Sequence, residues 1–425
     1  MLIRNATIYT AVQREPVQGD ILIRNGKIAA VGPNLDAAGE EVFDATGLNA
    51  YPGFVEAHCH IGLDGYGIGY EGADYNEYND SVVPQLRAID GIEPLDPTLG
   101  MAARAGVTTV CTGPGSANVL GGTFAAIKTV GRCVDDMIVK DNVAMKCAFG
   151  ENPKRCYRDK GISTRMSTAA KLREMLMKAK EYKRKLDEGK DPAFDMKLEA
   201  LIPVIEGKMP LKAHAHQLND LFTAIRIAKE FGVKLTLEHC TEGQLAAERF
   251  AAEGYPMAVG PSLTHASKFE LRNKTFATPG ILARAGAHVS IITDSPVIPQ
   301  HYLPLCAGLA VKSGMDPYDA LRAIRRRCPR GTLPADMLFG LLLAAAFLLF
   351  ALTYGGGQFR LYLFLAVGLT AILYFLTLSP AVVRLFQALF SLLGRFVQVI
   401  LTPARFFLKF LKKISKTLFA SFRKW

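Results

Sequence analysis

The balance of charge along this sequence changes abruptly near residue 323, and the change limits what the chain can fold into. Residues 321–425 contain fifteen lysines and arginines but a single acidic residue, Asp336. The whole chain carries +11, so residues 1–320 are slightly acidic, at about −3. A chain of 425 residues suits roughly two units, because one α/β barrel takes up roughly 200–250 residues. We therefore expect an ordinary globular unit followed by a basic unit of a different kind.

The first 50 residues predict a small antiparallel β unit. Residues 2–9 and 20–24 have the composition of strands, and Asn25-Gly26 is a strong hairpin signal before a third strand at 27–32. No leader pattern of charged and then apolar residues opens the chain at Met1, so we expect this part of the protein to be cytoplasmic.

Short buried strands alternate with helices between residues 51 and 323. This alternation is typical of a parallel sheet with helical crossovers, and we expect an α/β fold closed into a TIM-like (β/α)8 barrel. The predicted helices are 97–105, 167–190, 195–207, 218–231, 243–253 and 316–323. The predicted strands are 51–60, 107–112, 143–150, 211–216, 234–239, 256–260 and 288–293.

Four of the eight histidines stand at the ends of predicted strands. His58 and His60 are two residues apart on one strand, so both face the same side. His214 and His239 end two later strands, and Asp294 follows another. Barrel strands open onto one mouth, so we expect these five side chains to form a single metal site.

These motifs resemble the amidohydrolase superfamily, and more closely its imidazolonepropionase-like and prolidase-like members. The resemblance covers residues 1 to about 323. Its motifs are Pro52-Gly53-Phe54-Val55-Glu56-Ala57-His58-Cys59-His60, Ala105-Gly106-Val107-Thr108-Thr109-Val110, Lys212-Ala213-His214-Ala215-His216, Leu237-Glu238-His239 and Thr293-Asp294-Ser295-Pro296.

The resemblance also implies roles for individual residues. By this resemblance, the ligands of a divalent metal would be His58, His60, His214 and His239. Asp294 would be both a ligand and the general base. His216 is implied as a second catalytic or substrate-binding group, and a structural role is its alternative.

The carboxylate that completes such metal sites has more than one candidate. Glu151 ends the predicted strand that runs through 143–150, and it is the candidate that we favour as a further metal ligand. A lysine such as Lys146 or Lys154 would serve only after carbamylation.

The expected chemistry is hydrolysis of an amide, cyclic amide or peptide-like C–N bond in a small molecule. Imidazole and carboxylate ligands suit Zn²⁺ best and also accept Mn²⁺ or Fe²⁺, in one or two ions. The loops at 62–80 and 113–122 look like lids that contact substrate, and no feature indicates nucleic-acid binding. The sequence leaves a homo-oligomer open.

The resemblance breaks after residue 324. Relatives continue with strands that return to the N-terminal β unit and complete a β-sandwich, whereas this chain turns to Arg325-Arg326-Arg327. Residues 1–50 should therefore form a partial sandwich with unpaired edges and an uncovered apolar face, which puts enzymatic activity in question.

The remainder of the chain predicts membrane association. Residues 337–353 and 361–378 are uncharged apolar runs, which we interpret as a transmembrane hairpin with its flanks in the cytoplasm. Between the barrel at 51–323 and the first span lies a basic junction at 324–336. An interfacial helix at 381–402 would complete the membrane helices of 337–402, and 403–425 would form a basic amphipathic tail on an anionic membrane surface.

This tail resembles the later part of the spore cortex biosynthesis membrane-protein family of the YabQ type. The similarity covers about 325–425 and rests mainly on Gly357-Gln358-Phe359-Arg360-Leu361-Tyr362 and Leu373-Tyr374-Phe375-Leu376-Thr377-Leu378-Ser379. Two partial proteins thus meet near residues 321–326, through a real fusion or a mispredicted reading frame. The alternative function is a membrane-anchored sporulation protein that carries an inactive amidohydrolase.

Overall fold

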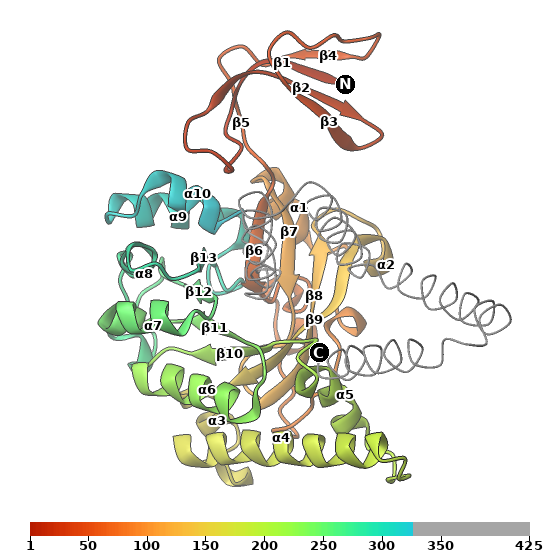
Figure 1. Cartoon of the computed structure of the whole chain (residues 1–425), viewed down its shortest axis with the longest axis vertical. Helices are drawn as coiled ribbons and strands as arrows, with labels where there is room; N and C mark the ends of the chain where they lie inside the picture. Colours follow the sequence, from red (N-terminus) through yellow and green to blue (C-terminus); the bar gives the residue numbers. More distant parts are fainter. Residues whose placement is uncertain (326–425) are drawn as a thin grey trace, which may run out of the picture. The chain divides into compact units, whose positions relative to one another are not determined.

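The computed structural model describes residues 1–325, and Figure 1 shows the arrangement of their elements. One eight-stranded sheet holds its strands in sequence order, from β6 to β13. The strands are β6 (Phe54–Cys59), β7 (Val107–Thr112), β8 (Leu120–Lys128), β9 (Ile138–Ala148), β10 (Leu211–Ala215), β11 (Leu235–His239), β12 (Met257–Val259) and β13 (Val289–Ile291). At the seam between β13 and β6, the backbone N–H of His60 donates to the carbonyl of Ser295. The sheet is therefore a nearly closed barrel, as the sequence predicted.

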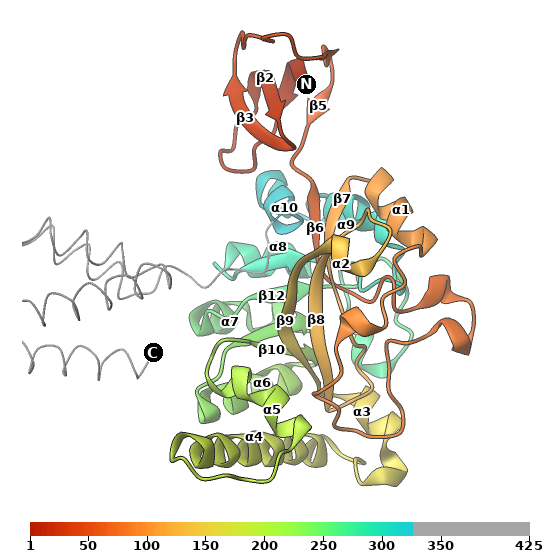
Figure 2. The same ribbon diagram turned by 90° about the vertical axis from the view of Figure 1, so that its right-hand side faces the viewer.

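One strand departs from the predicted (β/α)8 pattern. β8 runs antiparallel to both β7 and β9, and Figure 2 shows β8 and β9 side by side as a long hairpin. The short helix α2 (Val134–Met137) lies between β8 and β9 in the chain. All the other neighbouring pairs are parallel.

The sequence prediction missed β8 because its first residues look like a loop. Gly121 and Gly122 were assigned to the lid at 113–122, but they belong to the strand. Gly122 has φ +104°, and a Cβ atom there would lie 2.4 Å from the carbonyl oxygen of Leu86. Glycine at this position therefore reflects a close backbone approach within the sheet.

The helices cover the outside of the barrel. Predicted helices are confirmed as α1 (Pro97–Arg104), α4 (Arg165–Asp187), α5 (Met196–Ile205), α6 (Leu218–Phe231), α7 (Ala247–Glu253) and α10 (Pro317–Ala323). The short helices α2 and α3 (Glu151–Cys156) were not predicted, and neither were α8 (Thr278–Arg284) and α9 (Leu303–Lys312) on the outside of the barrel. Helices α8 and α9 begin without a side-chain cap, whereas Asp96, Thr164, Asp195 and Asp316 cap α1, α4, α5 and α10. Caps do not account for the difference, because α6 and α7 also lack a side-chain cap and were predicted from their apolar spacing.

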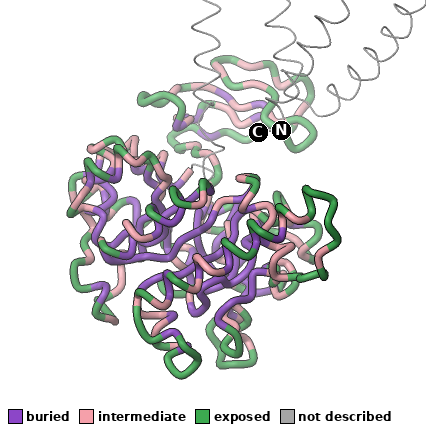
Figure 3. The backbone as a smooth tube through the Cα atoms, turned by 60° about the horizontal axis from the view of Figure 1, so that its bottom comes forward, coloured by how far each residue is buried: buried purple, intermediate pink, exposed green. Residues whose placement is uncertain are grey.

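Buried residues concentrate in the barrel strands and the helix faces that touch them, as Figure 3 shows. The interior of a TIM-like barrel is normally filled by branched apolar side chains. Here it also contains fully buried charged residues, among them Glu56, Lys146, Lys212 and Glu238. These four lie on the strands that carry the predicted site histidines or beside them.

Residues 1–50 form a separate five-stranded sheet. Its order is β3 (Lys27–Gly32), β2 (Val17–Arg24), β1 (Leu2–Ile8) and β4 (Val42–Asp44), and β5 (Asn49–Ala50) also pairs with β1. Ile28 of edge strand β3 is 68% exposed and Phe43 of edge strand β4 is 52% exposed. Within residues 1–325, no strand that follows the barrel joins this sheet. The expected open edges and apolar exposure are therefore present.

The membrane predictions fall outside the described residues. The proposed spans at 337–353 and 361–378, the interfacial helix at 381–402 and the tail at 403–425 all lie beyond residue 325. Among residues 1–325, no helix combines the length and the apolar character needed to cross a bilayer.

Candidate metal centre

Strand β6 supplies the first two histidines. The parallel ladder between β6 and β7 fixes the strand, and alternation then turns Glu56 and His58 into the barrel interior. His60 follows directly after the end of β6. Both imidazoles are buried, so neither is a solvent-exposed surface histidine.

Strands β10 and β11 supply three more histidines. His214 lies in β10, His216 follows it, and His239 is the last residue of β11. Glu238 already faces the interior, so its neighbour His239 would normally face outwards. His239 instead has φ +73°, a left-handed backbone conformation that is uncommon outside glycine and that turns its ring towards His214 and His58. Such local strain is found mainly at functional sites.

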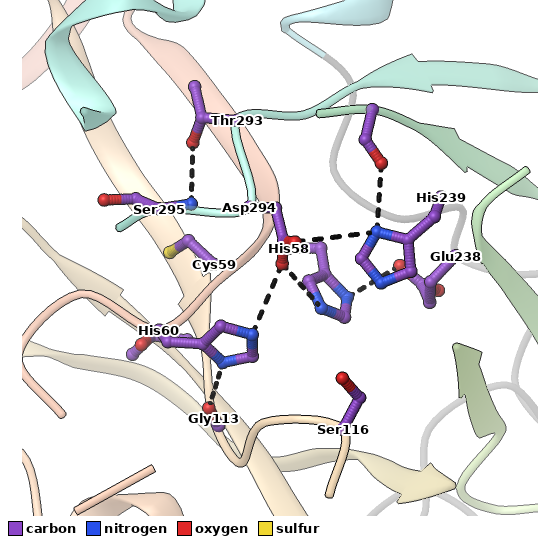
Figure 4. A network of polar contacts seen from close by, with 12 residues as sticks. His58, Cys59, His60, Gly113, Ser116, Glu238, His239, Thr293, Asp294 and Ser295 are labelled. Atoms are coloured by element: carbon purple, nitrogen blue, oxygen red, sulfur yellow. Dashed lines mark hydrogen bonds and ion pairs between the residues drawn. The ribbon is translucent and has the colours of Figure 1, made fainter. Parts of the chain in front are cut away.

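Asp294 belongs to the segment that follows β13, the last strand of the sheet, and lies next to the histidines of β6, the first strand. It lies just after β13 in a second left-handed conformation, with φ +54°. Its Oδ1 atom is 3.3 Å from His60 Nε2 and 3.6 Å from His58 Nε2, and its Oδ2 atom is 3.8 Å from His239 Nδ1. Figure 4 shows the carboxylate between these three rings.

These side chains form two clusters of potential ligand atoms within residues 1–325. We call His58, His60 and Asp294 the first group, and His214, His216 and His239 the second group. Within each group, the ligand atoms lie within 4.8 Å of one another. The rings of His58 and His239 are 5.1 Å apart, so the two groups are neighbours at one end of the barrel.

Hydrogen bonds to one ring nitrogen orient most of these imidazoles. His58 Nδ1 lies 2.9 Å from Glu238 Oε2, His60 Nδ1 lies 2.7 Å from the carbonyl of Gly113, and His239 Nδ1 lies 2.9 Å from the carbonyl of Gly260. Since carboxylate and carbonyl oxygens only accept, each Nδ1 is assigned the proton and each Nε2 keeps a lone pair. This second contact is the usual way in which proteins orient metal-binding histidines.

His214 and His239 offer ring nitrogens that have no hydrogen-bond partner among the described residues. They are Nδ1 and Nε2 of His214 and Nε2 of His239, all of them buried. In the first group, the lone pair of His60 Nε2 faces Asp294 Oδ1, which is also an acceptor. Buried polar atoms without partners, and acceptors that face acceptors, are costly unless a cation lies between them.

The electrostatic surroundings keep the imidazoles in the form that binds metals. Burial, together with the nearby lysines and histidines, lowers the pKa of His58, His214 and His216 well below the ordinary histidine value. Burial also lowers the pKa of His239 to about 4. Burial alone would raise the pKa of Asp294, but His239, His60 and Lys146 hold it below its ordinary value. At neutral pH His58, His214, His216 and His239 are therefore neutral imidazoles, and Asp294 is a carboxylate.

The structure separates the candidates for the additional carboxylate. Glu151 does not end a strand: β9 stops at Ala148, and Glu151 begins the short helix α3 (Glu151–Cys156). Its carboxylate accepts from the backbone of Glu270, and it belongs to neither group. Lys146 is fully buried in β9 with its Nζ 3.1 Å from His58 Nε2. Burial lowers the pKa of Lys146 to about 8.

The imidazole of His216 is oriented by a hydrogen bond to one ring nitrogen, and its other ring nitrogen lies near a carboxylate. Its Nδ1 lies 2.8 Å from Thr241 Oγ1, and its Nε2 lies 3.8 Å from Glu270 Oε1. Lys268 forms an ion pair with the same Glu270 oxygen at 2.6 Å. The site thus includes a buried acid from the segment between β12 and β13 that the sequence analysis did not identify.

Other residues around the site were also missed from the sequence. Glu238 accepts bonds from His58 Nδ1, Lys212 Nζ and Thr236 Oγ1 inside the barrel. The sequence did contain a signal for two of these residues. Lys212 stands two residues before His214 and Glu238 stands one residue before His239, and both lie in predicted strands so apolar that a buried charge there needs a partner. Glu270 gave no signal, since it lies in a short 3-10 turn, Phe269–Leu271, outside the strands that carry the site histidines.

The two predicted lids lie beside the first group. Tyr75, from the loop at 62–80, stacks on His60 with ring centroids 5.4 Å apart. Its neighbour Asn76 accepts a hydrogen bond from the backbone of Ala117, in the loop that follows β7. The two loops are thus joined to each other next to the histidines.

An eight-stranded barrel with clustered histidines and an aspartate at one end is the arrangement expected of a metal-dependent hydrolase. The chain is similar to the crystal structure of an amidohydrolase from Thermotoga maritima MSB8, with 41% identity and a TM-score of 0.74. The similarity covers 76% of this chain and 86% of that one. The chain therefore belongs to the amidohydrolase family.

Curated relatives give the same class over smaller shares of their length. Amidohydrolase tasK of Hapsidospora irregularis is 27% identical over 390 residues, which covers 79% of this chain and 39% of that protein. A D-hydantoinase of Geobacillus stearothermophilus is 47% identical over 62 residues, which covers 15% of this chain and 13% of the hydantoinase. The chain thus spans about two fifths of the first of these relatives and a short part of the second.

A family model described as spore cortex protein YabQ matches residues 304–379. This supports the second resemblance, although the match begins earlier than 325 and ends before 425. Its first residues are the barrel helices α9 and α10, where Cys306, Ala310 and Ala320 pack in the same apolar cluster as Val107. Physically, residues 304–325 are part of the barrel.

Proposed function

We propose that this chain is a metal-dependent hydrolase of amide or cyclic amide C–N bonds. His58, His60 and Asp294 would hold one divalent ion, and His214 and His239 would hold a second. The observation that carries the proposal is the set of buried lone pairs without hydrogen bonds on His214 and His239, next to the facing acceptors of His60 and Asp294.

The residues present fit a zinc-like cation. Two ligands about 2.0–2.1 Å from a tetrahedral zinc ion stand roughly 3.3 to 3.4 Å from each other. His60 Nε2 and Asp294 Oδ1 are 3.3 Å apart. Neutral imidazoles with one carboxylate suit Zn²⁺, and Mn²⁺ or Fe²⁺ accept the same ligands. When bound, such an ion supplies a Lewis acid that makes water more acidic and polarises a carbonyl.

The side chains of the protein then divide the remaining work. Asp294 would accept the proton of the attacking water and return it to the leaving nitrogen. His216, fixed by Thr241, would contact the substrate. Tyr75 and the loops that it joins would cover the substrate and exclude bulk water.

Lys146 is the candidate that we propose for the additional carboxylate. As an ammonium group, it donates to the lone pair of His58 that a cation would use. If the free amine of Lys146 attacks CO2, a C–N bond forms and a proton leaves the nitrogen, giving a carbamate with one negative charge. Carbamylation would thus turn Lys146 from a donor that competes with the cation into a ligand of it. Glu151, at the start of α3, belongs to neither histidine group.

Cyclic amides are the substrate class that we propose first. A D-hydantoinase shares 47% identity over 62 residues, and an allantoinase of Salmonella choleraesuis shares 44% identity over 73 residues. Both names refer to cyclic compounds with amide bonds in the ring. The buried site favours a small ring over a long peptide, because the lids lie close above His60.

Metal analysis of the purified full-length chain tests this proposal. We expect one or two divalent ions per chain, and a His58→Ala/His60→Ala variant should lose at least one of them. The matched control is His265→Ala/His288→Ala, which changes two exposed histidines outside the groups and should keep the metal. Hydrolysis should then be assayed on hydantoin, allantoin and dihydroorotate. A folded protein without metal, or with equal content in both variants, would refute the proposal.

The match to the YabQ family model favours a second candidate, a membrane-anchored spore cortex protein joined to the hydrolase. We also propose the domain division on which it depends. The barrel would occupy residues 51–323, and the junction at 324–336 and the membrane segments would follow. The junction would begin at Ile324, whose carbonyl still accepts from the N–H of Val55. Sequencing the transcript through codons 315–335 tests whether the hydrolase and the YabQ-like segment are encoded as one chain. One uninterrupted message supports a fusion, and two separate reading frames would remove it.

A further inference from the structure

One fully buried carboxylate, that of Glu56, lies at the seam of the barrel and is not part of the proposed chemistry. It lies on β6, two residues before His58, and points into the interior. Four hydrogen-bond donors converge on it. They are the backbone N–H of His58 at 3.0 Å, the N–H and Oγ1 of Thr293 at 2.9 and 2.7 Å, and Nε2 of Gln300 at 2.9 Å.

These donors come from both sides of the seam. His58 belongs to the first strand of the barrel, whereas Thr293 and Gln300 follow the last one. No ladder of paired strands joins β6 to β13 within the described residues. Glu56 therefore supplies, by a side chain, part of the connection that strand pairing provides elsewhere in the barrel.

The contact between Glu56 and Thr293 also bears on the metal site, because of where Thr293 stands in the chain. Thr293 immediately precedes Asp294, whose left-handed backbone needs support from its surroundings. One oxygen of Glu56 holds the residue before Asp294, and the other holds the N–H of His58. Glu56 therefore holds the Asp294 turn against β6 on one side of Asp294, while the bond from His60 N–H to the carbonyl of Ser295 holds it on the other.

We propose that Glu56 is a positioning residue, which clamps the Asp294 turn to β6 so that His58, His60 and Asp294 form a single cation site across the barrel seam. This inference rests on the proposed function, because it takes the first group as a metal site. Glu56 itself does not touch the metal or the substrate. All four contacts are donors, from three residues: His58 N–H bonds Oε1, and the two Thr293 groups and Gln300 Nε2 bond Oε2.

The amide variant Glu56→Gln should disturb this clamp with little change in volume. Either orientation of the glutamine amide sets its NH₂ group against a donor, His58 N–H or the Thr293 pair. Outer contacts of metal ligands are typically worth about 10–100-fold in metal affinity. We expect a loss of at least about tenfold for the first group, with an intermediate loss for Glu56→Asp, which keeps the charge but is shorter.

Cobalt titration of the first group alone tests the clamp. In a His214→Ala/His239→Ala background, Co²⁺ binding is followed by its visible absorption, and Glu56→Gln is then added. The matched control is Glu242→Gln, a buried carboxylate that caps Leu218 N–H and contacts no member of the first group. Glu242→Gln should lower the melting temperature and keep the Co²⁺ affinity within about twofold.

The outcomes separate the clamp from the proposed function. If the background protein is folded and binds no Co²⁺, the first group is not a metal site, and the proposed function fails together with this inference. If the background binds Co²⁺ and Glu56→Gln binds it equally well, only the clamp is refuted. Should Glu56→Gln not fold, Thr293→Val removes one donor and keeps the carboxylate. It should weaken Co²⁺ binding several-fold, and unchanged binding would also refute the clamp.

Discussion

The two histidine groups lie side by side but are held in different ways. In the first group, both imidazoles have a fixed Nδ1, and the group contains its own carboxylate, Asp294. The second group consists of three neutral rings, and His214 has no hydrogen bond on either nitrogen among the described residues. The first group therefore contains its own carboxylate, whereas the carboxylate beside the second group is that of Glu270, whose Oε1 lies 3.7 Å from His214 Nε2 and 3.8 Å from His216 Nε2. This difference predicts which changes will affect each group.

Replacing the carboxylate of the first group should have the largest effect. Asp294→Asn keeps the shape of the side chain but removes both the charge and the proton acceptor. Turnover of a cyclic amide should fall roughly 10²- to 10⁴-fold, with an unchanged circular dichroism spectrum. Near-normal turnover would contradict the role of Asp294 as the base.

Removing Lys146 should affect the ion beside His58, because Lys146 Nζ lies 3.1 Å from His58 Nε2. Lys146→Met keeps an unbranched apolar stem but cannot react with CO2, so metal content should fall by about one ion per chain in equilibrium dialysis. Glu151→Gln is the matched comparison and should leave the metal content unchanged. The reverse pattern would restore Glu151 as the additional ligand.

His216 should differ from the other members of its group, because we assign it to the substrate. His216→Asn should raise KM about tenfold, as expected for the loss of a buried polar contact, and should leave both metals bound. Loss of a metal ion from this variant would instead make His216 a ligand.

The smallest effect should come from Thr241, which only orients His216. Thr241→Val removes the partner of His216 Nδ1 and should cost about 1 kcal/mol of stability and a few-fold in kcat/KM. Urea unfolding and steady-state kinetics measure the two effects. A loss as large as that of His216→Asn would mean that Thr241 itself contacts the substrate.

The arrangement of the two histidine groups could be predicted from the sequence only in part. Spacing two residues apart on a strand was enough to place His58 and His60 on one face, and the order of strands placed His214 and Asp294 at the same end. The left-handed turn at His239 is a tertiary feature, since alternation alone would turn that ring away from the site once Glu238 faces inwards.

The difference between the expected and the observed position of Glu151 has a similar origin. The prediction extended the strand of Lys146 past residue 148, but Gly150 has φ +82° and starts a new direction before Glu151. A shift of two or three residues at a strand end thus exchanged one candidate for another. The antiparallel β8 was missed for a comparable reason, because its glycines serve a close approach to Leu86 that only the folded chain reveals.

The positions of bound metal ions test the central claim most directly. Crystals of the full-length chain grown with Zn²⁺ should be measured at the zinc absorption edge. We expect an anomalous peak bounded by His58, His60 and Asp294, and a second peak bounded by His214 and His239. A folded protein crystallised with Zn²⁺ that shows no peak at either histidine group would contradict the proposed metal centre.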